Sequence, residues 1–474
     1  MNKKNIIIKS NKRNNYLFKE EYNYISLYNP IYFNDKNNYY SKKKKYLNEI
    51  FNKSSQHTQI KELNLSKEII LKHLTNSPQI VFEVTDSCNL NCTYCGYGKM
   101  YNNHTQRNIG LMPFQYFLSV FTYLRKLWDS DFNIYPHEKK IYVSFYGGEP
   151  LLNFKFIHDA VEFLKHINCQ TRQFIFSMTS NCMLLDKYMD FLAENQFDLL
   201  VSLDGNVNNN SYRVNKIGKS VFYKVVDNVK KLKREHHEYF EHHVRFNTVL
   251  HDRNSITEAY DYIFKNFGKR PSINELNLAG INPIYKDNMN NMFRSLTEDY
   301  NKITDKKSKA KVLYSSLAYK NSLLFLNNIS ADNYKKNFNQ IFNGRTPVDL
   351  TIYPTGTCLP FSRKIFITVN GNILPCERIG NELSFGKVCS NEMKIDFPFI
   401  NDFYNKMYKK YISLCSKCKR INECPVCFLS NPDAYTFCCK KNDSTYRREY
   451  IGKIVSLLEA NPSKYIPMIN SIIK

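Results

Sequence analysis

Short runs of apolar and β-branched residues alternate, from residue 79 onward, with longer segments whose apolar residues fall on one stripe. The short runs predict strands, and the 3.6-residue spacing of the longer segments predicts amphipathic helices. The predicted strands are 79–86, 140–147, 173–180, 198–205, 243–250 and 273–280. The predicted helices between them are 112–129, 153–167, 186–196, 220–236 and 256–267.

This alternation predicts an α/β fold. Six strands separated by helices favour a parallel sheet with right-handed crossovers, which is either open or curled into a partial barrel. In such folds the chemistry lies at the carboxyl ends of the strands. We therefore expect the functional side chains in the loops that follow the strands.

The remaining segments do not show this alternation of strand and helix patterns. Residues 1–78 are rich in Asn, Lys and Tyr and have weak periodicity, so they form either a small α+β module or a poorly ordered arm. After the α/β region (79–284) we expect a helical connector (285–345), a cysteine-rich domain (346–445) and a C-terminal segment (446–474) with a helix around 446–460. Two or three domains suit a chain of 474 residues.

The amino-acid composition indicates the cellular compartment and the kinds of partner to expect. The sequence contains no apolar run of about 18 residues and no signal-peptide pattern at its start, so we expect a cytoplasmic protein without a membrane partner. In a reducing compartment the fourteen cysteines favour metal sites over disulfides. The formal charge of +24 raises the possibility of nucleic-acid binding, but the lysines are scattered, and an acidic peptide is the more plausible partner.

The first cysteine cluster follows the first predicted strand. The sequence TDSCNLNCTYCGYGK places Cys88, Cys92 and Cys95 in a CxxxCxxC pattern. Three thiolates on one short loop can hold three irons of a 4Fe–4S cluster and leave the fourth iron open. The alternative, a structural zinc site, would need four closed ligands.

With the YGGEPLL turn at 146–152, this loop resembles the radical S-adenosylmethionine (radical SAM) superfamily. The resemblance implies a partial (β/α)6 barrel and a 4Fe–4S cluster whose open iron binds S-adenosyl-L-methionine. Tyr94 matches the aromatic residue before the last cysteine and is expected near the adenine. Gly147 and Gly148 are expected to let the backbone approach the methionyl amine, and Glu149 to accept a hydrogen bond from it.

The resemblance extends to the ends of the next two predicted strands. In MTSNC, Ser180 and Asn181 occupy a place where many relatives have Thr-Asn-Gly, and Cys182 replaces the glycine. Ser202 is a candidate hydrogen-bonding partner of the cofactor carboxylate or ribose, and Arg213 a candidate ion-pair partner of the carboxylate. In the alternative reading, Ser202 and Arg213 only cap and solvate a loop.

A second cysteine set lies between residues 358 and 439. Its CxxCxxxxxCxxC array does not by itself distinguish zinc from iron. The whole set resembles the SPASM domain, which carries two auxiliary 4Fe–4S clusters. By position, the first would be ligated by Cys358, Cys376 and Cys427, and the second by Cys415, Cys418, Cys424 and either Cys438 or Cys439.

Two details of this set bear on catalysis. No cysteine lies shortly upstream of Cys358, so the first auxiliary cluster has either an open iron, able to bind a substrate thiolate, or an unexpected ligand. Glu377 follows Cys376 and is a candidate general base, although it could simply pair with Arg378. Three further cysteines fit no pattern and are expected to be buried thiols: Cys169, Cys182 and Cys389.

The resemblance implies a peptide maturase that forms a thioether, carbon–carbon or similar crosslink in a ribosomally made precursor peptide. Its other partner would be a reductant such as ferredoxin or flavodoxin, and residues 1–78 would dock a leader peptide. Two alternatives stay open: an anaerobic sulfatase-maturing, formylglycine-forming enzyme, and a zinc-ribbon protein that binds nucleic acid. The last leaves the YGGEPLL turn and the strand order unexplained.

Overall fold

The structure is a computed structural model. It describes residues 65–102, 110–134, 139–167, 169, 171–278, 280–313, 319, 322, 353–416, 418, 424, 426–429, 449 and 451–457, and the backbone of 5–9, 15–19 and 24–26. The chain forms two compact units, each treated by itself below. One unit holds Leu65–Ser316 and Cys358–Tyr404, and the other holds Met1–Asn64, Leu317–Thr357 and Asn405–Lys474.

Six parallel strands form most of an eight-stranded sheet in the order β11-β10-β4-β5-β6-β7-β8-β9. They are β4 (Gln79–Thr85), β5 (Lys139–Gly147), β6 (Arg172–Ser180), β7 (Asp198–Ser202), β8 (Val244–Leu250) and β9 (Ser272–Glu275). Each pairs in parallel with its neighbour, as in a partial α/β barrel. The six predicted strands and their parallel arrangement are therefore confirmed.

Two of these strands end earlier than predicted. β7 stops at Ser202. The Leu203 amide still donates to the Asn247 carbonyl of β8 at 3.1 Å, and Asp204 beyond it is buried. β9 stops at Glu275 rather than at 280. Beyond it the chain pairs with the end of the first cysteine loop, where the Asn102 amide donates to the Gly280 carbonyl at 3.0 Å.

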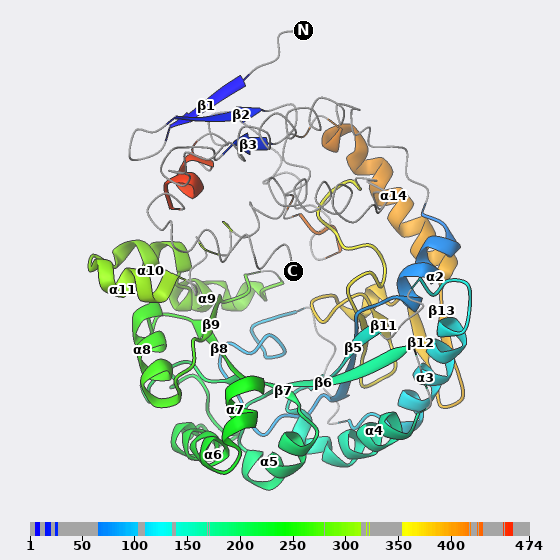
Figure 1. Cartoon of the computed structure of the whole chain (residues 1–474), viewed down its shortest axis with the longest axis horizontal. Coiled ribbons are helices and arrows are strands. Elements are labelled where there is room, and N and C mark those ends of the chain that lie inside the picture. Colours follow the sequence, from blue (N-terminus) through cyan, green and yellow to red (C-terminus); the bar gives the residue numbers. More distant parts are fainter. Residues whose placement is uncertain are drawn as a thin grey trace, which may run out of the picture. The chain divides into compact units, whose positions relative to one another are not determined.

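The predicted helices lie on the outer side of the sheet (Figure 1). They are α3 (Phe114–Trp128), α4 (Phe154–His166), α5 (Leu185–Glu194), α6 (Phe222–Glu235) and α8 (Ile256–Phe267). A short helix, α7 (His237–His243), was not predicted. The core between sheet and helices is aromatic: the ring of Phe82 on β4 lies 5.0 Å from that of Phe117 on α3, and both are fully buried. Burial of such rings supplies much of the driving force for docking these helices.

Two strands from the cysteine-rich segment extend this sheet, a feature that the sequence pattern did not predict. β10 (Ile365–Ile367) pairs in parallel with β4, and β11 (Ile373–Leu374) pairs antiparallel with β10. The buried carboxylate of Glu83 also accepts a hydrogen bond from the Val369 amide at 3.0 Å. The edge of β4 is thereby covered, which satisfies backbone groups that an edge strand would leave unpaired.

A second hairpin follows in the same segment. It consists of β12 (Gly386–Val388) and β13 (Met393–Ile395). Cys389 lies directly after β12 and is exposed, so the prediction that it is a buried thiol is wrong. Tight turns between paired strands lie at the surface, which explains the exposure.

Further short elements complete this unit. They are α2 (Lys67–Thr75), α9 (Lys286–Met292), α10 (Leu296–Lys302), α11 (Lys306–Val312), and the 3₁₀ turns η2 (Pro150–Asn153), η3 (Pro283–Tyr285) and η6 (Asn381–Leu383). A long helix, α14 (Phe397–Cys415), begins in this unit. α9, α10 and α11 fall in the predicted connector, of which 314–345 lies almost entirely outside the described residues.

In the other unit, three strands form an antiparallel sheet in sequence order. They are β1 (Asn5–Lys9), β2 (Asn15–Lys19) and β3 (Tyr24–Ser26). Residues 451–457 are helical, within the helix predicted around 446–460.

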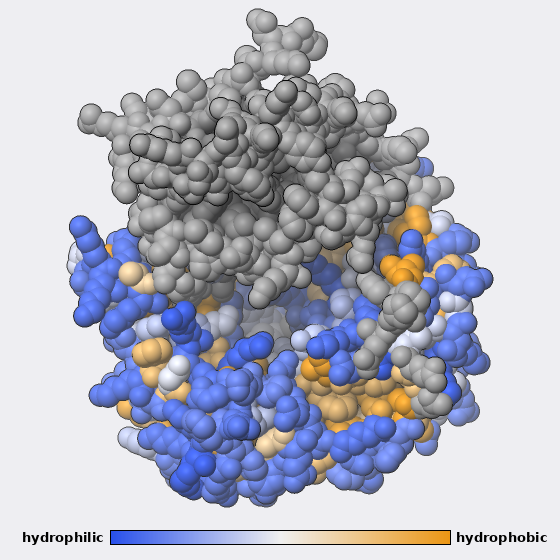
Figure 2. Space-filling view, viewed as in Figure 1, coloured by the Kyte–Doolittle hydropathy of each residue, from blue (hydrophilic) through white to orange (hydrophobic). Residues whose placement is uncertain are grey.

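Hydrophilic residues cover most of the coloured surface in Figure 2. In the part of the chain that the structure describes, no helix has the length and apolar character needed to cross a membrane.

Candidate functional site

The first cysteine loop begins where β4 ends and carries Cys88, Cys92 and Cys95, all partly buried. Two tight turns shape it: the Cys95 amide donates to the Cys92 carbonyl at 3.1 Å, and the Gly98 amide donates to the Cys95 carbonyl at 2.7 Å. The Cys88 sulfur accepts from the Leu90 amide at 3.4 Å. The loop thus has a defined conformation around its three sulfur atoms.

A second segment holds the loop in place. The amide of Asn91 donates to the carbonyl of Val214 at 2.8 Å, and the amide of Thr93 donates to the carbonyl of Tyr212 at 3.1 Å. These bonds connect the cysteine loop to the loop that follows β7. The two loops are therefore joined by backbone hydrogen bonds.

The GGEP turn packs backbone to backbone against the start of the cysteine loop. A Cβ atom on Gly147, whose φ is +138°, would lie 2.0 Å from the Thr85 carbonyl oxygen, and one on Gly148 would lie 2.0 Å from that of Ser87. The amides of Gly148 and Glu149 donate to these same carbonyls at 3.0 and 2.9 Å. We expected these glycines to make room for the cofactor amine; in this structure they make room for the loop.

The carboxylate of Glu149 faces the next strand end. It is buried and accepts hydrogen bonds from the Ser180 hydroxyl (2.8 Å), the Asn181 amide (2.7 Å) and the Leu151 amide (3.3 Å). Burial raises the pKa of Glu149 to about 7, although these hydrogen bonds lower it in part. The predicted acceptor for the cofactor amine is thus engaged within the protein.

Asn181 connects this turn to the cysteine loop. Its side-chain amide donates to the Asn89 carboxamide oxygen at 2.7 Å and lies 3.8 Å from the Cys88 sulfur. Cys182 has a φ of +62°, the left-handed conformation that a glycine at this position would adopt without strain. Its thiol is fully buried, as predicted, whereas Cys169 is only partly buried.

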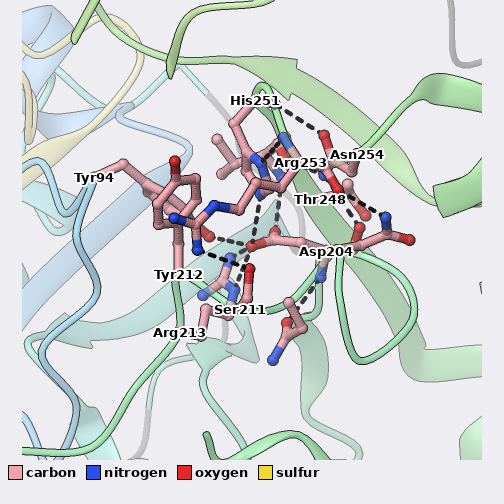
Figure 3. A network of polar contacts seen from close by, with 12 residues as sticks. Tyr94, Asp204, Ser211, Tyr212, Arg213, Thr248, His251, Arg253 and Asn254 are labelled. Carbon is pink, nitrogen blue, oxygen red and sulfur yellow. Dashed lines mark hydrogen bonds and ion pairs between the residues drawn. The ribbon is translucent and has the colours of Figure 1, made fainter. Parts of the chain in front are cut away.

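The structure reveals a buried carboxylate that the motif analysis missed. Asp204, two residues beyond β7, has no exposed surface. Figure 3 shows the polar contacts around it. Asp204 binds Arg213 in a bidentate ion pair, with Nε to Oδ2 at 2.9 Å and Nη2 to Oδ1 at 3.0 Å. It also accepts from the hydroxyl of Tyr94 and from the Val249 amide at 3.0 Å. We name Asp204, Arg213, Tyr94 and His251 the Asp204 network.

His251 packs on the aromatic side of this network. Its ring stacks on Tyr94 with centroids 5.7 Å apart and meets Tyr212 edge-on at 4.9 Å. Nδ1 accepts from the Arg253 amide at 3.1 Å, so in the neutral ring the proton is on Nε2, which lies 3.8 Å from the Asp204 carboxylate. The Asp204 network therefore connects the cysteine loop to the ends of β7 and β8.

The network changes two expectations. Tyr94, expected near an adenine, packs among buried residues and donates to Asp204. Arg213, expected to pair with a ligand carboxylate, pairs with Asp204. The one signal in the sequence was Asp204 itself, which lies in VSLDG at the end of a predicted strand.

The electrostatics follow from this burial. Desolvation acts to raise the pKa of Asp204, but Arg213, His251 and Tyr94 hold it at about 2. Burial, with smaller contributions from Cys95 and Cys88, raises the pKa of the Cys92 thiol to about 12, and Arg213 opposes this rise. Arg213 is therefore the positive charge that would favour a thiolate at Cys92.

Ser202 and Glu377 are the remaining candidates in this unit. Ser202 is partly buried at the end of β7, on the strand that leads to Asp204. Glu377 pairs with Lys364 at 2.9 Å. Desolvation acts to raise the pKa of Glu377, but Lys364 and Arg378 bring it below its usual value, which makes this carboxylate a weaker base. Its proposed role as a general base stays a prediction.

The second cysteine set divides between the two compact units. Cys358 and Cys376 belong to the unit with the sheet, and both are partly buried. The CxxCxxxxxCxxC array belongs to the other unit, with Cys415 buried and three members partly buried: Cys418, Cys424 and Cys427. Cys438 and Cys439 lie outside the described residues. The assignment of ligands to two auxiliary clusters stays a prediction.

Among the residues with described positions, no three His, Cys, Asp or Glu side chains converge closely enough to hold a single metal ion.

Comparison with known proteins identifies the central region. The family model of the Radical SAM superfamily matches residues 82–263. The chain is 27% identical over 194 residues to a cysteine-type anaerobic sulfatase-maturating enzyme of Clostridium novyi, covering 40% of this chain and 48% of that protein. It is 28% identical over 205 residues to a serine-type anaerobic sulfatase-maturating enzyme of Bacteroides thetaiotaomicron, covering 41% and 44%. The alignments thus span about half the length of these relatives.

Two solved structures align with this chain at lower identity. The structure of native anSMEcpe with bound AdoMet aligns with a TM-score of 0.48 and 18% identity, covering 83% of this chain and 99% of that one. That of Streptococcus suis SuiB bound to S-adenosylmethionine aligns with a TM-score of 0.40 and 16% identity, covering 75% and 73%.

Proposed function

Because this chain belongs to the radical SAM superfamily through residues 82–263, we propose that it reductively cleaves S-adenosyl-L-methionine to modify a peptide. Cys88, Cys92 and Cys95 would hold the 4Fe–4S cluster. When bound, that cluster would supply one electron to the sulfonium, giving methionine and a 5′-deoxyadenosyl radical that abstracts hydrogen from the substrate.

One observation carries this proposal: the GGEP turn and the cysteine loop form a single packed unit. A Cβ atom on Gly148 would lie 2.0 Å from the Ser87 carbonyl oxygen, and paired amide-to-carbonyl bonds join the turn to the start of the loop. A loop fixed in this way presents three sulfur donors on one short segment. This donor set suits a cluster that keeps one iron open.

The chain's own residues have definite tasks in this scheme. The Asp204 network holds the cysteine loop from the β7 and β8 side, and Glu149 with Asn181 holds it from the β6 side. Binding sites of this kind depend on residues locked by their own hydrogen bonds. The protein would orient the substrate hydrogen and exclude water from the radical.

The substrate would be a ribosomally made precursor peptide that receives a thioether, carbon–carbon or similar crosslink. In support, the cysteines from Cys358 onward resemble those of an auxiliary-cluster domain that accompanies peptide chemistry, although the CPVC pair is one residue shorter than the usual spacing. The antiparallel strands β1, β2 and β3 offer an edge to which a leader peptide could add a strand. A ferredoxin or flavodoxin would supply the electron.

A second candidate is favoured by the named relatives. Two of them are sulfatase-maturating enzymes, of the cysteine and serine types. This chain would then oxidise a cysteine or serine of a sulfatase to formylglycine. Membership in the radical SAM superfamily argues against the zinc-ribbon alternative, because it accounts for the cysteine loop and the GGEP turn together.

The core of the proposal is tested by anaerobic reconstitution. The protein should bind about twelve irons per chain, four for each of three clusters, and form 5′-deoxyadenosine only with dithionite present. Cys92→Ala should abolish this product, whereas Cys389→Ala, a change at an exposed cysteine outside the patterns, should retain it. Turnover by Cys92→Ala would refute the assignment.

The substrate is tested separately. Incubation with a sulfatase-derived peptide and with the product of a neighbouring small reading frame, followed by mass spectrometry, distinguishes the two candidates. Formylglycine from serine and a thioether or carbon–carbon crosslink each remove two hydrogen atoms and give the same mass, whereas formylglycine from cysteine also exchanges sulfur for oxygen. Reaction of the formylglycine aldehyde with a hydrazide before mass spectrometry therefore distinguishes the products. Modification of only the sulfatase peptide would overturn the crosslinking proposal.

A further inference from the structure

A cavity of about 470 Å³ lies along the strands of the partial barrel. Five neighbouring strands contribute to its wall, with Gln79 on β4, Ser144 on β5, Ser177 on β6, Leu200 on β7 and Arg245 on β8. A cavity of this volume falls within the range of sites that bind small molecules or peptide side chains.

Most polar groups of the wall satisfy one another. The Gln79 side-chain amide donates to the Ser144 hydroxyl at 2.8 Å, and the Ser144 and Ser177 hydroxyls are 2.6 Å apart. This chain of hydrogen bonds crosses three strands. It gives the wall a fixed polar surface.

The charged groups of the wall are paired, with one exception. Lys364 pairs with Glu377 at 2.9 Å, and His243 lies 3.1 Å from Asp198. The side chain of Arg245, an exposed residue, has no ion pair or hydrogen-bond partner among the residues that the structure describes. With His243 neutral, the positive charges of Arg245 and Lys364 equal the negative charges of Asp198 and Glu377, and of these four side chains only Arg245 lacks such a partner there.

We propose that Arg245 anchors a carboxylate of the peptide substrate in this cavity. This inference rests on the proposed function, because it assigns a binding group for the peptide. A guanidinium is planar and presents paired donors that match the two oxygens of a carboxylate. The carboxylate would come from an Asp or Glu side chain or from the C-terminus of the peptide.

The position of the cavity suits a substrate that reaches the cysteine loop. Arg245 is the second residue of β8, at the amino end of the strand, whereas the cysteine loop follows the carboxyl end of β4. Tyr146, which directly precedes Gly147 of the GGEP turn, also lines the cavity. The wall therefore runs from the anchor to the turn that holds the cysteine loop. An extended peptide bound at Arg245 could follow it.

The test measures binding of three pentapeptides to the anaerobically reconstituted protein. Each carries a neutral fluorophore, and fluorescence anisotropy is read at low ionic strength. The peptides are Ser-Gly-Glu-Gly-Ser amide, Ser-Gly-Gln-Gly-Ser with a free C-terminus, and Ser-Gly-Gln-Gly-Ser amide. We expect one of the two carboxylate peptides to bind at least about tenfold more tightly than the neutral one, and which one it is identifies the carboxylate source.

Variants assign the preference to one residue. Arg245→Gln should abolish the preference, and Arg245→Lys should keep part of it, because an ammonium group carries the charge without the paired donors. Arg234→Gln is the matched control: Arg234 lies exposed on α6, where it pairs with Glu235, and its change should leave the preference intact.

Two results would overturn the inference: equal binding of all three peptides, or a carboxylate preference that survives in Arg245→Gln. Either result is distinguishable from failure of the proposed function, which is scored by 5′-deoxyadenosine formation without any peptide.

Discussion

Replacing Asp204 by Asn tests whether the Asp204 network holds the cysteine loop. The Asp204 carboxylate accepts four hydrogen bonds, two from Arg213, one from Tyr94 and one from the Val249 amide. An Asn side chain has one acceptor oxygen, and it leaves the buried guanidinium of Arg213 without a counter-charge. Breaking a buried pair from one side costs about 3–5 kcal/mol. At about 2–4 °C per kcal/mol for a large domain, the melting temperature should fall by about 6–20 °C.

Urea unfolding of the cluster-free protein measures this loss, and iron content after reconstitution reports whether the loop still binds its cluster. The matched control is Asp186→Asn. Asp186 pairs with Lys224 at 2.6 Å on the surface, where such pairs contribute at most about 1 kcal/mol. Adding Arg213→Met to Asp204→Asn should restore part of the stability, because it removes the unpaired charge. If Asp204→Asn costs no more than Asp186→Asn, the network has no supporting role.

Two further changes test the turn beside the loop. Gly148→Ala should lower both stability and iron content, because the added Cβ atom would lie 2.0 Å from the Ser87 carbonyl oxygen. The control is Gly96→Ala in the cysteine loop, which should be tolerated because an added Cβ atom there would have no neighbour within 4 Å among the described residues, its own chain neighbours aside. Equal iron content in the two variants would contradict the packing argument. The pKa of Glu149 is raised from 4.5 to about 7 in the folded state. As pH rises, its carboxyl group therefore stays protonated to a higher pH in the folded state than in the unfolded state. The free energy of unfolding should therefore fall by about 3 kcal/mol between pH 4.5 and 7 on this account. Wild type minus Glu149→Gln, measured by urea unfolding across that range, should show the slope, and a flat difference would refute the buried titration.

The sequence was most informative where periodicity or a motif acts locally. The six strands and their intervening helices follow from alternation and 3.6-residue spacing. The strand ends at Ser202 and Glu275 were missed, because beyond them the chain forms contacts distant in sequence, at Asp204 and with Asn102. The pairing of β10 with β4 was missed for the same reason, since it joins segments almost three hundred residues apart.

In the candidate site, too, local features were predicted from the sequence and contacts between distant segments were not. The spacing of Cys88, Cys92 and Cys95, together with their position after the first strand, predicts them as cluster ligands, since their side chains share one loop. Asp204 lies in VSLDG at the end of a predicted strand, yet nothing local to this segment indicates that Arg213 and Tyr94 both bind it. Pairings of this kind arise only when the ends of several strands meet, and a single sequence carries no direct signal of that meeting.

The contacts between motif residues and distant parts of the protein affect how activity data on these residues should be interpreted. Gly148, Glu149 and Arg213 were each expected to contact the cofactor, and in this structure each contacts another part of the protein. A variant at any of them can therefore lose activity by displacing the cysteine loop, with no cofactor contact involved. Loss of 5′-deoxyadenosine formation is consequently ambiguous by itself. Measuring both iron content and the affinity for S-adenosyl-L-methionine distinguishes the two causes. Substitution of a residue that only holds the loop should lower iron content, whereas substitution of a residue that binds the cofactor should lower the affinity while iron content stays full.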